Sequence, residues 1–296
     1  MNTLGKITMA WVMVSTLLVS PVFSQENTIK NQQNKTLSAG IGFPTSLGSM
    51  QARIGIGAGG FPDYEGSNDY SAKALPIVDI EKPSVFFIKG ANINANDGLA
   101  SAGLTLFHLT YMHGPTIEAQ FLVGPLIRVY QGRDEDGNDA LNGMGDIDYS
   151  ASIGAFLILS SRAWLLNFAM APQNVGNNNG GLLTTLDAAY TTSINNKLKL
   201  SSGLSASWAD DDYMQNYFGV TNNQAANTEL PQFDINAGLK DIGVNLKTTY
   251  ALSKHWILDG QVGYWRLLND TANSPLVDNE GSENQIRGLI GLSYQF

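Results

Sequence analysis

Residues 285–296 read QIRGLIGLSYQF, and in this stretch apolar and polar positions alternate almost one by one. The positions on one face are apolar or glycine: Ile286, Gly288, Ile290, Leu292, Tyr294 and Phe296. A period of two residues predicts a β-strand with one apolar face. The stretch is about twice as long as the mean strand of ~5–6 residues. A tilted strand of about 9–11 residues can cross a bilayer, so the pattern indicates a strand of a membrane barrel.

Strands of the same kind recur from residue 49 onward. In residues 116–130, apolar residues at odd-numbered positions alternate with Gln120, Arg128 and other polar or small residues. In residues 197–208 the second face carries Ser and Gly beside two lysines. A soluble β-sandwich would expose faces rich in charge, whereas a barrel lumen accommodates small side chains. The composition of these faces therefore favours a barrel over a sandwich.

Aromatic residues near the predicted strand ends point to the same fold. Transmembrane barrels carry girdles of aromatic side chains at both of their interfaces with water. The residues expected in these girdles are Tyr130, Trp164, Trp208, Tyr250, Trp256, Trp265, Tyr294 and Phe296.

The alternation predicts about twelve strands, with ten as the alternative. They span residues 49–60, 71–82, 84–92, 99–111, 116–131, 146–160, 163–172, 181–193, 197–209, 233–251, 256–268 and 285–296. Short and long connections alternate along the chain, as expected for short periplasmic turns and long extracellular loops. The predicted fold is all-β: a single antiparallel transmembrane β-barrel, whose closure leaves no unpaired edge in the hydrocarbon.

One predicted strand, residues 233–251, changes phase within its length. Its apolar residues fall on odd positions up to Leu239 and on even positions from Ile242 onward. The slip at Lys240 and Asp241 predicts a β-bulge, in which one extra residue shifts the alternation. A short turn followed by an additional strand is the other interpretation.

The N-terminus resembles an export signal. Lys6 precedes an apolar core at residues 7–19, and small residues lead up to a cleavage site after Ser24. We therefore expect a cleaved signal peptide at residues 1–24, a polar periplasmic N-terminal segment without regular pattern at 25–48, and the outer-membrane barrel at 49–296 of a Gram-negative bacterium.

Composition excludes several classes of function. The formal net charge of −9 argues against nucleic-acid binding, which needs a basic surface. The chain has no Cys, which excludes a disulfide framework, a zinc–thiolate site, a Cys nucleophile and an N-terminal lipid anchor on Cys. No HExxH or GxSxG motif is present, and the three His residues are not grouped. We expect no catalytic residue, no cofactor and no enzyme activity.

Acidic runs at residues 134–139 and 210–212 lie in predicted outer loops. Asp134, Asp136 and Asp139 could hold a calcium ion, but the spacing lacks the distal Glu of an EF-hand. The simpler interpretation is a hydrated acidic loop that faces lipopolysaccharide.

Charged residues on the polar faces are candidates for the lumen. They are Arg53, Glu118, Arg128, Asp148, Asp187, Lys199, Asp234, Lys247, Asp259 and Arg287. Both signs occur, and unpaired charges in a low-dielectric wall are costly, so we expect them to pair across the interior or to hold water. A packed ionic network would close the lumen, whereas a hydrated pore would use these charges to tune selectivity.

Several short motifs, taken together and in order, resemble the MltA-interacting protein (MipA/OmpV) family of Gram-negative outer-membrane proteins. The motifs are PDYEGSNDY at residues 62–70, LNGMGDID at 141–148, YFGVT at 217–221, TANSPLV at 271–277 with GS at 281–282, and the terminal YQF. The family-motif residues are Tyr64, Gly66, Ser67, Gly145, Asp146, Asp148, Tyr217, Phe218, Gly219, Val220, Ser274, Pro275, Gly281 and Ser282.

The resemblance implies an outer-membrane barrel. For the members that give the family its name, it also implies a scaffold that joins a murein-degrading lytic transglycosylase to a bifunctional penicillin-binding protein in peptidoglycan assembly. Other members are described as porin-like or adhesin-like, so a narrow diffusion channel for small solutes and a surface adhesion or stress-response barrel remain alternatives. The expected partners also include outer-membrane lipid and lipopolysaccharide.

The terminal Phe296 can be interpreted independently of the family resemblance. A C-terminal aromatic residue after an alternating strand is what the assembly machinery of outer membranes recognises, so Phe296 is interpreted as an assembly signal.

Overall fold

The structure is a computed structural model that describes residues 27–30, 35–41, 49–90, 93–94, 96, 98–113, 116–175 and 178–296. The predicted signal peptide at 1–24 lies outside the described residues. Fifteen strands form one sheet in the described part of the chain. The strands are β1 (Asn27–Lys30), β2 (Lys35–Ile41), β3 (Gln51–Pro62), β4 (Tyr70–Lys82), β5 (Phe86–Gly90), β6 (Ala100–Leu104), β7 (Phe107–His113), β8 (Thr116–Tyr130), β9 (Ser150–Ser161), β10 (Trp164–Val175), β11 (Asn178–Ser193), β12 (Leu198–Ala209), β13 (Gly238–Ala251), β14 (Trp256–Leu267) and β15 (Asn284–Gln295).

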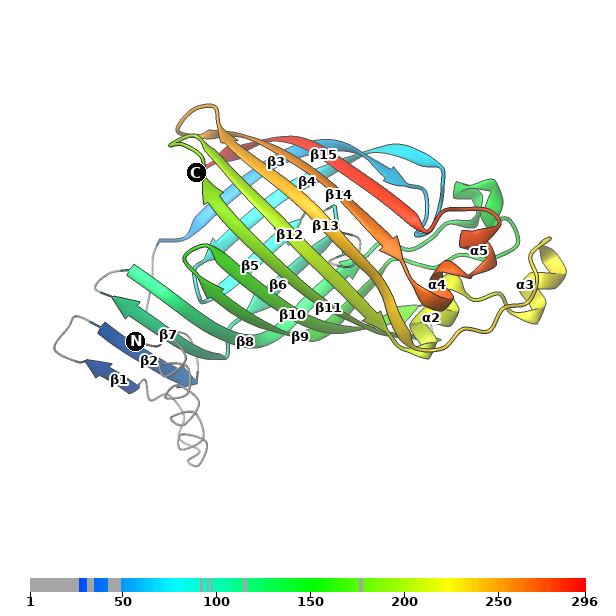
Figure 1. Ribbon diagram of the computed structural model, residues 1–296, viewed down its shortest axis with the longest axis horizontal. Helices are drawn as coiled ribbons and strands as arrows, with labels where there is room; N and C mark the ends of the chain where they lie inside the picture. Colours follow the sequence, from blue (N-terminus) through cyan, green and yellow to red (C-terminus); the bar gives the residue numbers. More distant parts are fainter. Residues whose placement is uncertain are drawn as a thin grey trace, which may run out of the picture.

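The sheet closes on itself. The last strand, β15, pairs antiparallel with β3 from Gly288 opposite Gly60 to Gln295 opposite Arg53. Strands β6 and β7 lie end to end along one edge of β8, while β9 pairs with its other edge. Counted as one position, β6 and β7 make the barrel twelve-stranded, so the predicted antiparallel barrel is confirmed (Figure 1).

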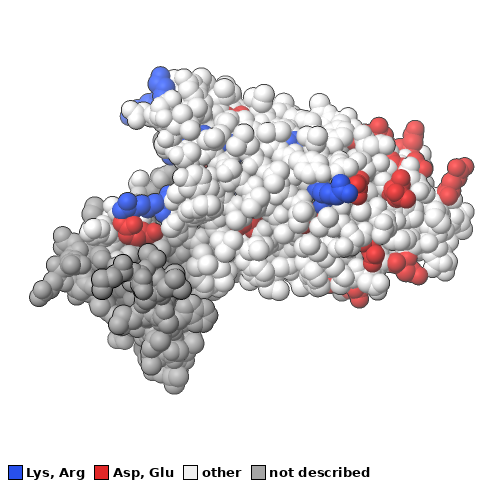
Figure 2. Space-filling view, in the orientation of Figure 1, with Lys and Arg blue, Asp and Glu red and all other residues white. Residues whose placement is uncertain are grey.

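The outer surface of the barrel is apolar. Ile153 is 73% exposed and Ile290 is 68% exposed, and both lie on the outward-facing positions of their strands. Figure 2 shows a wide band with few charged side chains between the two ends of the visible face. Such a band suits hydrocarbon, because apolar side chains lose nothing by facing lipid.

The described part of the chain contains no helix that is both long enough and apolar enough to cross a membrane.

Inward-facing positions carry the buried polar residues, among them Arg128, Asp259 and Arg287. Two of the aromatic residues predicted for the girdles also face inward, so that part of the prediction is wrong. Tyr130 has the same parity as Arg128 in β8, and Trp265 has the same parity as Asp259 in β14; both rings are buried.

The predicted bulge is present in β13. Ser207 pairs with Asp241 and Trp208 pairs with Leu239, which leaves Lys240 as the extra residue. The alternative of an additional strand is therefore wrong. The strand begins at Gly238 rather than at residue 233, because residues 233–237 belong to the preceding loop.

The strand predicted at 99–111 is broken in two. Ala100–Leu104 and Phe107–His113 pair with β8 in registers that differ by one residue. At the break, the Thr105 amide donates to the carbonyl of Val85, whereas the Leu106 amide donates to that of Val123. Because of this shift, odd-numbered residues face inward in β6 and even-numbered residues face inward in β7. Leu104 and His108 therefore lie on opposite faces, although both numbers are even.

The helices gather at the end of the barrel opposite the C-terminus (Figure 1). We call this the loop end, and the opposite end, with the short turns, the turn end. The helices of the described residues are two short 3₁₀ segments, η2 (Glu135–Gly137) and η3 (Asp139–Leu141), and four α-helices, α2 (Asp211–Phe218), α3 (Asn222–Asn227), α4 (Asn269–Ala272) and α5 (Pro275–Asp278). Most of the visible acidic side chains lie at the loop end (Figure 2).

The N-terminal segment differs from the expectation. Residues 25–48 were expected to have no regular pattern, yet the structure places β1 and β2 within them. Strand β2 pairs with β7 from Lys35 opposite His113 to Ile41 opposite Phe107. The reason lies in the wall: β5 begins only at Phe86, which pairs with Leu104 in β6, so the corresponding edge of β7 has no barrel neighbour. Strand β2 occupies that edge and extends the sheet at the turn end.

Candidate functional site

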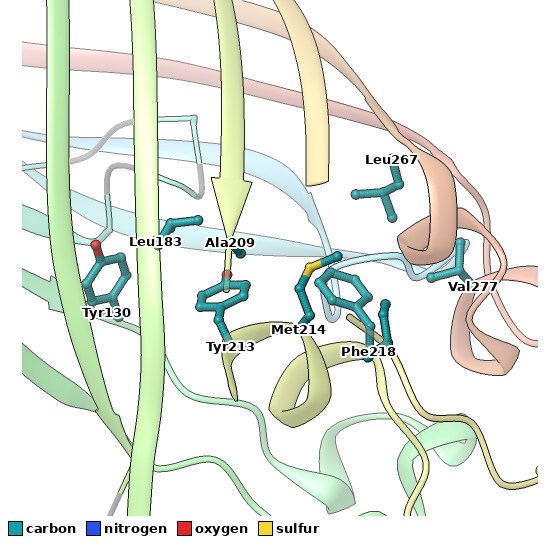
Figure 3. Packing of buried hydrophobic residues seen from close by; sticks show 9 residues of the cluster. Tyr130, Leu183, Ala209, Tyr213, Met214, Phe218, Leu267 and Val277 are labelled. Atoms are coloured by element: carbon teal, nitrogen blue, oxygen red, sulfur yellow. The ribbon is translucent and has the colours of Figure 1, made fainter. Parts of the chain in front are cut away.

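A buried apolar cluster closes the loop end of the lumen. Helix α2 starts at an N-cap, Asp210, whose side chain accepts a hydrogen bond from the Tyr213 amide (3.0 Å). The helix turns Tyr213, Met214 and Phe218 toward the lumen, and Phe218 has no exposed surface (Figure 3). These side chains pack on residues near the loop ends of the strands and on neighbouring loops: Tyr130, Leu183, Ala209, Ile235, Leu267 and Val277.

A second, polar layer lies against the wall at the bulge. The Lys240 side chain is fully buried and lies 2.8 Å from Asp241. Its ammonium also donates to Glu65, in the loop after β3, and to the Asn96 side chain (2.7 Å). The bulge turns the extra residue inward, and burial of this charge requires the partners that surround it.

Residues between β5 and β6 fold into the lumen. Ile93, Asn94 and Asn96 are all buried. The Asn96 amide donates to both oxygens of Asp241 at 3.1 Å, and its carbonyl accepts from Arg128 at 3.0 Å. This connection, predicted as an outer loop, thereby joins the strand-borne charges into one network.

Below this layer lies a lumen cavity of about 490 Å³, whose lining combines charged and amide side chains with apolar ones. Arg53 donates to Asp259 at 2.6 Å and lies 3.3 Å from Asp79. Lys89 pairs with Asp79 and with Glu81, the latter at 2.5 Å. Opposite charges therefore pair along the inner wall near the turn end, on the neighbouring strands β3, β4 and β5 and, for Arg53 and Asp259, across the intervening β15.

The remaining candidate lumen charges are not all in the lumen. Asp187 and Lys247 line the cavity, and Asp187 accepts from Asn94 at 3.3 Å. Lys199 occupies an inward position near the turn end but is exposed.

Glu118 is the extra residue of a bulge in β8 and pairs with Arg162 beside the turn end. Asp148 and Asp234 are exposed in loops at the loop end, so their assignment to the lumen is wrong. The physical reason is that β9 and β13 begin later than the sequence pattern suggested, at Ser150 and Gly238.

The family-motif residues come together at the loop end. The Tyr64 hydroxyl donates to the Leu276 carbonyl at 3.0 Å, and the Ser274 hydroxyl donates to the Phe218 carbonyl at 2.5 Å. Ser67 forms a β-bridge with Gly281. A packed cluster of Tyr64, Leu141, Met144, Val220, Leu230 and Leu276 joins four of the loops.

Other motif residues make local contacts in the same loops. The Gly145 amide donates to Glu135 at 2.9 Å, and Asp146 accepts from the Glu135 amide at 2.8 Å. The Ser282 amide donates to the Gly66 carbonyl at 2.7 Å. Pro275 begins α5, Gly219 caps α2, and Tyr217 lies in α2.

Burial shifts the pKa values of several groups in these loops. Desolvation, with a smaller contribution from Glu280, raises the pKa of Tyr64 to about 12. Desolvation also raises the pKa of Tyr217 and lowers that of Arg133. The Tyr217 hydroxyl donates to Gln173 at 2.8 Å, and its backbone carbonyl accepts from Arg133 at 3.1 Å.

The structure assigns no chemistry to the acidic loops or the histidines. Within the described ranges, no group of three Asp, Glu or His side chains lies close enough to hold a metal ion. Asp134 caps η2 by accepting from the Asp136 amide at 3.0 Å. His108 is buried in β7, and His255 stacks on Tyr294. Phe296 is exposed and packs edge-on against Tyr294. Its role as an assembly signal stays a prediction.

Sequence reasoning missed Lys240, Glu65 and Asn96 as members of the network. Lys240 carried a signal, because it stands at the phase slip and a bulge re-aims its side chain. Glu65 and Asn96 belong to loops, whose path the alternation does not predict.

Comparison with known proteins agrees with this geometry. The family model described as MltA-interacting protein MipA matches residues 54–296. The MltA-interacting protein of Escherichia coli (strain K12) is 21% identical over 264 residues, covering 88% of this chain and 94% of that protein. A protein of Escherichia coli O157:H7 named "Putative outer membrane protein YiaT" is 21% identical over 259 residues, covering 86% of this chain and 97% of that protein.

Among solved structures, a loop L8 deletion mutant of OmpT, an outer membrane protein of Vibrio cholerae, is 9% identical with a TM-score of 0.37, covering 89% of this chain and all of the other. In outer-membrane barrels the short turns face the periplasm and the long loops face outward. Because the family model covers most of its length, the chain belongs to the MltA-interacting protein MipA family, and it is an outer-membrane β-barrel.

Proposed function

We propose that this protein is a non-enzymatic scaffold that binds a murein-degrading lytic transglycosylase at its periplasmic face, beside a bifunctional penicillin-binding protein. The name of the Escherichia coli relative states that it interacts with MltA. The observation that carries the proposal is the contrast between the ends: the loop end is covered by α2, whereas the sheet at the turn end extends beyond the wall through β2 and β7.

The extended sheet supplies a surface that short turns alone do not. Strand β2 covers one edge of β7, and β1 pairs with β2 from Asn27 opposite Ala39 to Lys30 opposite Thr36. A stable protein interface buries about 1,600 Å² in total. The β1–β2 hairpin, together with the neighbouring turns, is the part of the turn end that stands out from the barrel (Figure 1).

Binding of purified MltA to the immobilised, detergent-solubilised protein tests the proposal. We compare the intact mature chain with a variant that lacks residues 27–41, which removes β1 and β2. The matched control lacks residues 222–227, which removes α3 at the loop end. We expect the first deletion to weaken binding by at least about tenfold, since it removes a central part of the interface, and the control to bind normally.

The outcomes test the scaffold function and the binding role of β1 and β2 separately. No binding by the intact chain contradicts the scaffold function. Equal binding by the intact chain and the hairpin deletion contradicts the role of β1 and β2. Heat-dependent mobility in gel electrophoresis verifies that each variant has folded into a barrel.

A narrow channel for small solutes is the second candidate, and the lumen cavity of about 490 Å³ favours it. The cavity contains ion pairs of the kind that tune selectivity in pores. Purified protein in a planar bilayer would then show steady conductance, and Arg128→Glu would shift its ion selectivity toward cations. Conductance indistinguishable from that of the bare bilayer would contradict a channel.

A further inference from the structure

A cavity of about 150 Å³ lies between the loop-end segments and the barrel wall, separate from the lumen cavity that holds the Arg53 ion pairs. Three cationic side chains from distant parts of the sequence line it. Lys73 comes from β4, Arg133 from the loop after β8, and Arg287 from β15.

The side chain of Arg287 makes no hydrogen bond or ion pair in the part of the chain that the structure describes, although the residue is only 5% exposed. Its guanidinium lies over the Trp265 ring, 5.1 Å from the centroid. Contact with an aromatic face leaves the N–H donors at the guanidinium edge unused. A buried charge without a partner is costly, so this arrangement calls for an anion at that edge.

The other two cations are also incompletely paired. Arg133 donates from Nη1 to the Tyr217 carbonyl at 3.1 Å, but its buried Nε has no hydrogen-bond partner among the described residues. The half-buried Lys73 side chain makes no hydrogen bond or close ion pair with any described residue, although the Asp63 carboxylate is near enough to interact with its charge. All three side chains therefore have donor capacity left for a ligand.

Two carboxylates line the same cavity, and both are engaged elsewhere. Asp63 accepts from the Ser71 hydroxyl at 2.5 Å with one oxygen and from Asn138 at 3.1 Å with the other. Glu65 pairs with the fully buried Lys240 and accepts from the Tyr213 hydroxyl at 3.4 Å. Among the described residues that line the cavity, three cations stand against two carboxylates that accept hydrogen bonds from other groups, which leaves a surplus of positive charge.

We propose that this cavity is a binding site for a small oxyanion of the phosphate class. Guanidinium groups match the oxygens of phosphate in a two-pronged geometry, and a lysine adds a point charge. The cavity volume of about 150 Å³ is well above the ~10–15 Å³ that one water needs on the same measure, so a group of the size of phosphate has room. The phosphate could be a free ion or belong to a lipid headgroup.

Calorimetric titration of the delipidated protein in detergent tests the site with two probes. The first is inorganic phosphate, and the second is lipid A compared with its dephosphorylated form. The variants are Arg287→Gln and Lys73→Gln, each of which removes one cation from the cavity. The matched control is Arg266→Gln, because Arg266 is an exposed arginine on the neighbouring strand β14 that pairs with Glu283 at 2.6 Å.

We expect saturable binding that weakens at least about tenfold in both cavity variants and is unchanged in the control. Binding of inorganic phosphate identifies a free anion, whereas binding only of phosphorylated lipid A identifies a headgroup; either result supports the site. Absence of binding by both probes overturns the proposal. Equal binding by Lys73→Gln and the intact protein, with the barrel verified as folded, overturns it as well.

Discussion

The two ends of the barrel solve the problem of buried charge differently. At the loop end, Lys240 has no exposed surface and is held by Glu65, Asp241 and Asn96 beneath an apolar helix. At the turn end, Lys89 pairs with Asp79 and Glu81 but remains 40% exposed. At the turn end all three groups lie on strands, whereas at the loop end Glu65 and Asn96 come from connections between strands, so the difference comes from the loops that cover one end.

The contrast shows that the alternation along the strands decides which side chains face inward, whereas the loops decide how far water is excluded from that interior. Ion pairs in a dry interior depend on every partner, because removal of one leaves the other charge unpaired. Ion pairs open to water contribute little, since solvent screens them. The comparison can therefore be tested by removing one cation at each end.

The largest effect is expected at the loop end. Lys240→Met leaves Glu65 and Asp241 without their buried cation, and we expect a loss of about 3–5 kcal/mol in the free energy of unfolding. Urea unfolding in detergent or lipid vesicles, followed by tryptophan fluorescence, measures it. The control is Arg266→Gln, whose exposed pair with Glu283 contributes at most about 1 kcal/mol. Both cations lie at the loop end, so equal losses in the two variants would show that the burial of Lys240 adds nothing to the value of its pairs.

The apolar cover of the loop end should give the next effect. Phe218→Ala removes a side chain without exposed surface, and a truncation of this kind costs about 3 kcal/mol or more in a well-packed site. Because α2 belongs to a loop, we expect faster proteolysis within residues 210–237 while the strands stay protected. Asn223→Ala, at an exposed position of α3, is the control. Unchanged proteolysis of the Phe218 variant would show that α2 does not seal the lumen.

The barrel itself could be predicted from the sequence, because apolar and polar residues alternate within each strand. The phase slip even located the bulge at Lys240, since one extra residue reverses parity for all that follows. The same rule, applied to Tyr130 and Trp265, would have placed both rings inside. The position of the two rings near strand ends favours a girdle, but parity along the strand decides which side of the wall a side chain faces.

The path of the loops and the N-terminal extension of the sheet, β1 and β2, could not be predicted in this way. Asn96 and Glu65 reach Lys240 through tertiary contacts that have no periodic signature. Strand β2 forms because β5 leaves an edge of β7 uncovered, which depends on the lengths of other strands. The small oxyanion site likewise depends on Lys73, Arg133 and Arg287 meeting across three separate segments.

A smaller effect is expected at the turn end. Lys89→Gln removes the cation from the pairs with Asp79 and Glu81, and we expect a loss below about 1 kcal/mol because the Lys89 side chain is 40% exposed. The same urea titration used for Lys240→Met measures it, so the ratio of the two losses is a direct comparison of the ends. A loss as large as that of Lys240→Met would mean that the turn end is as dry as the loop end.

The smallest effect appears only at high pH and again concerns the loop end. Burial raises the pKa of Tyr64 to about 12, above the ordinary value near 10. A raised pKa in the folded state means that the neutral phenol favours folding; this contribution is complete below pH ~10 and is lost as pH rises toward 12. The tyrosinate absorbance of the intact protein minus that of Tyr64→Phe should therefore titrate near 12 in the folded state. In denaturant the same difference should titrate near 10, and equal midpoints in the two states would show that the loops do not exclude water from Tyr64.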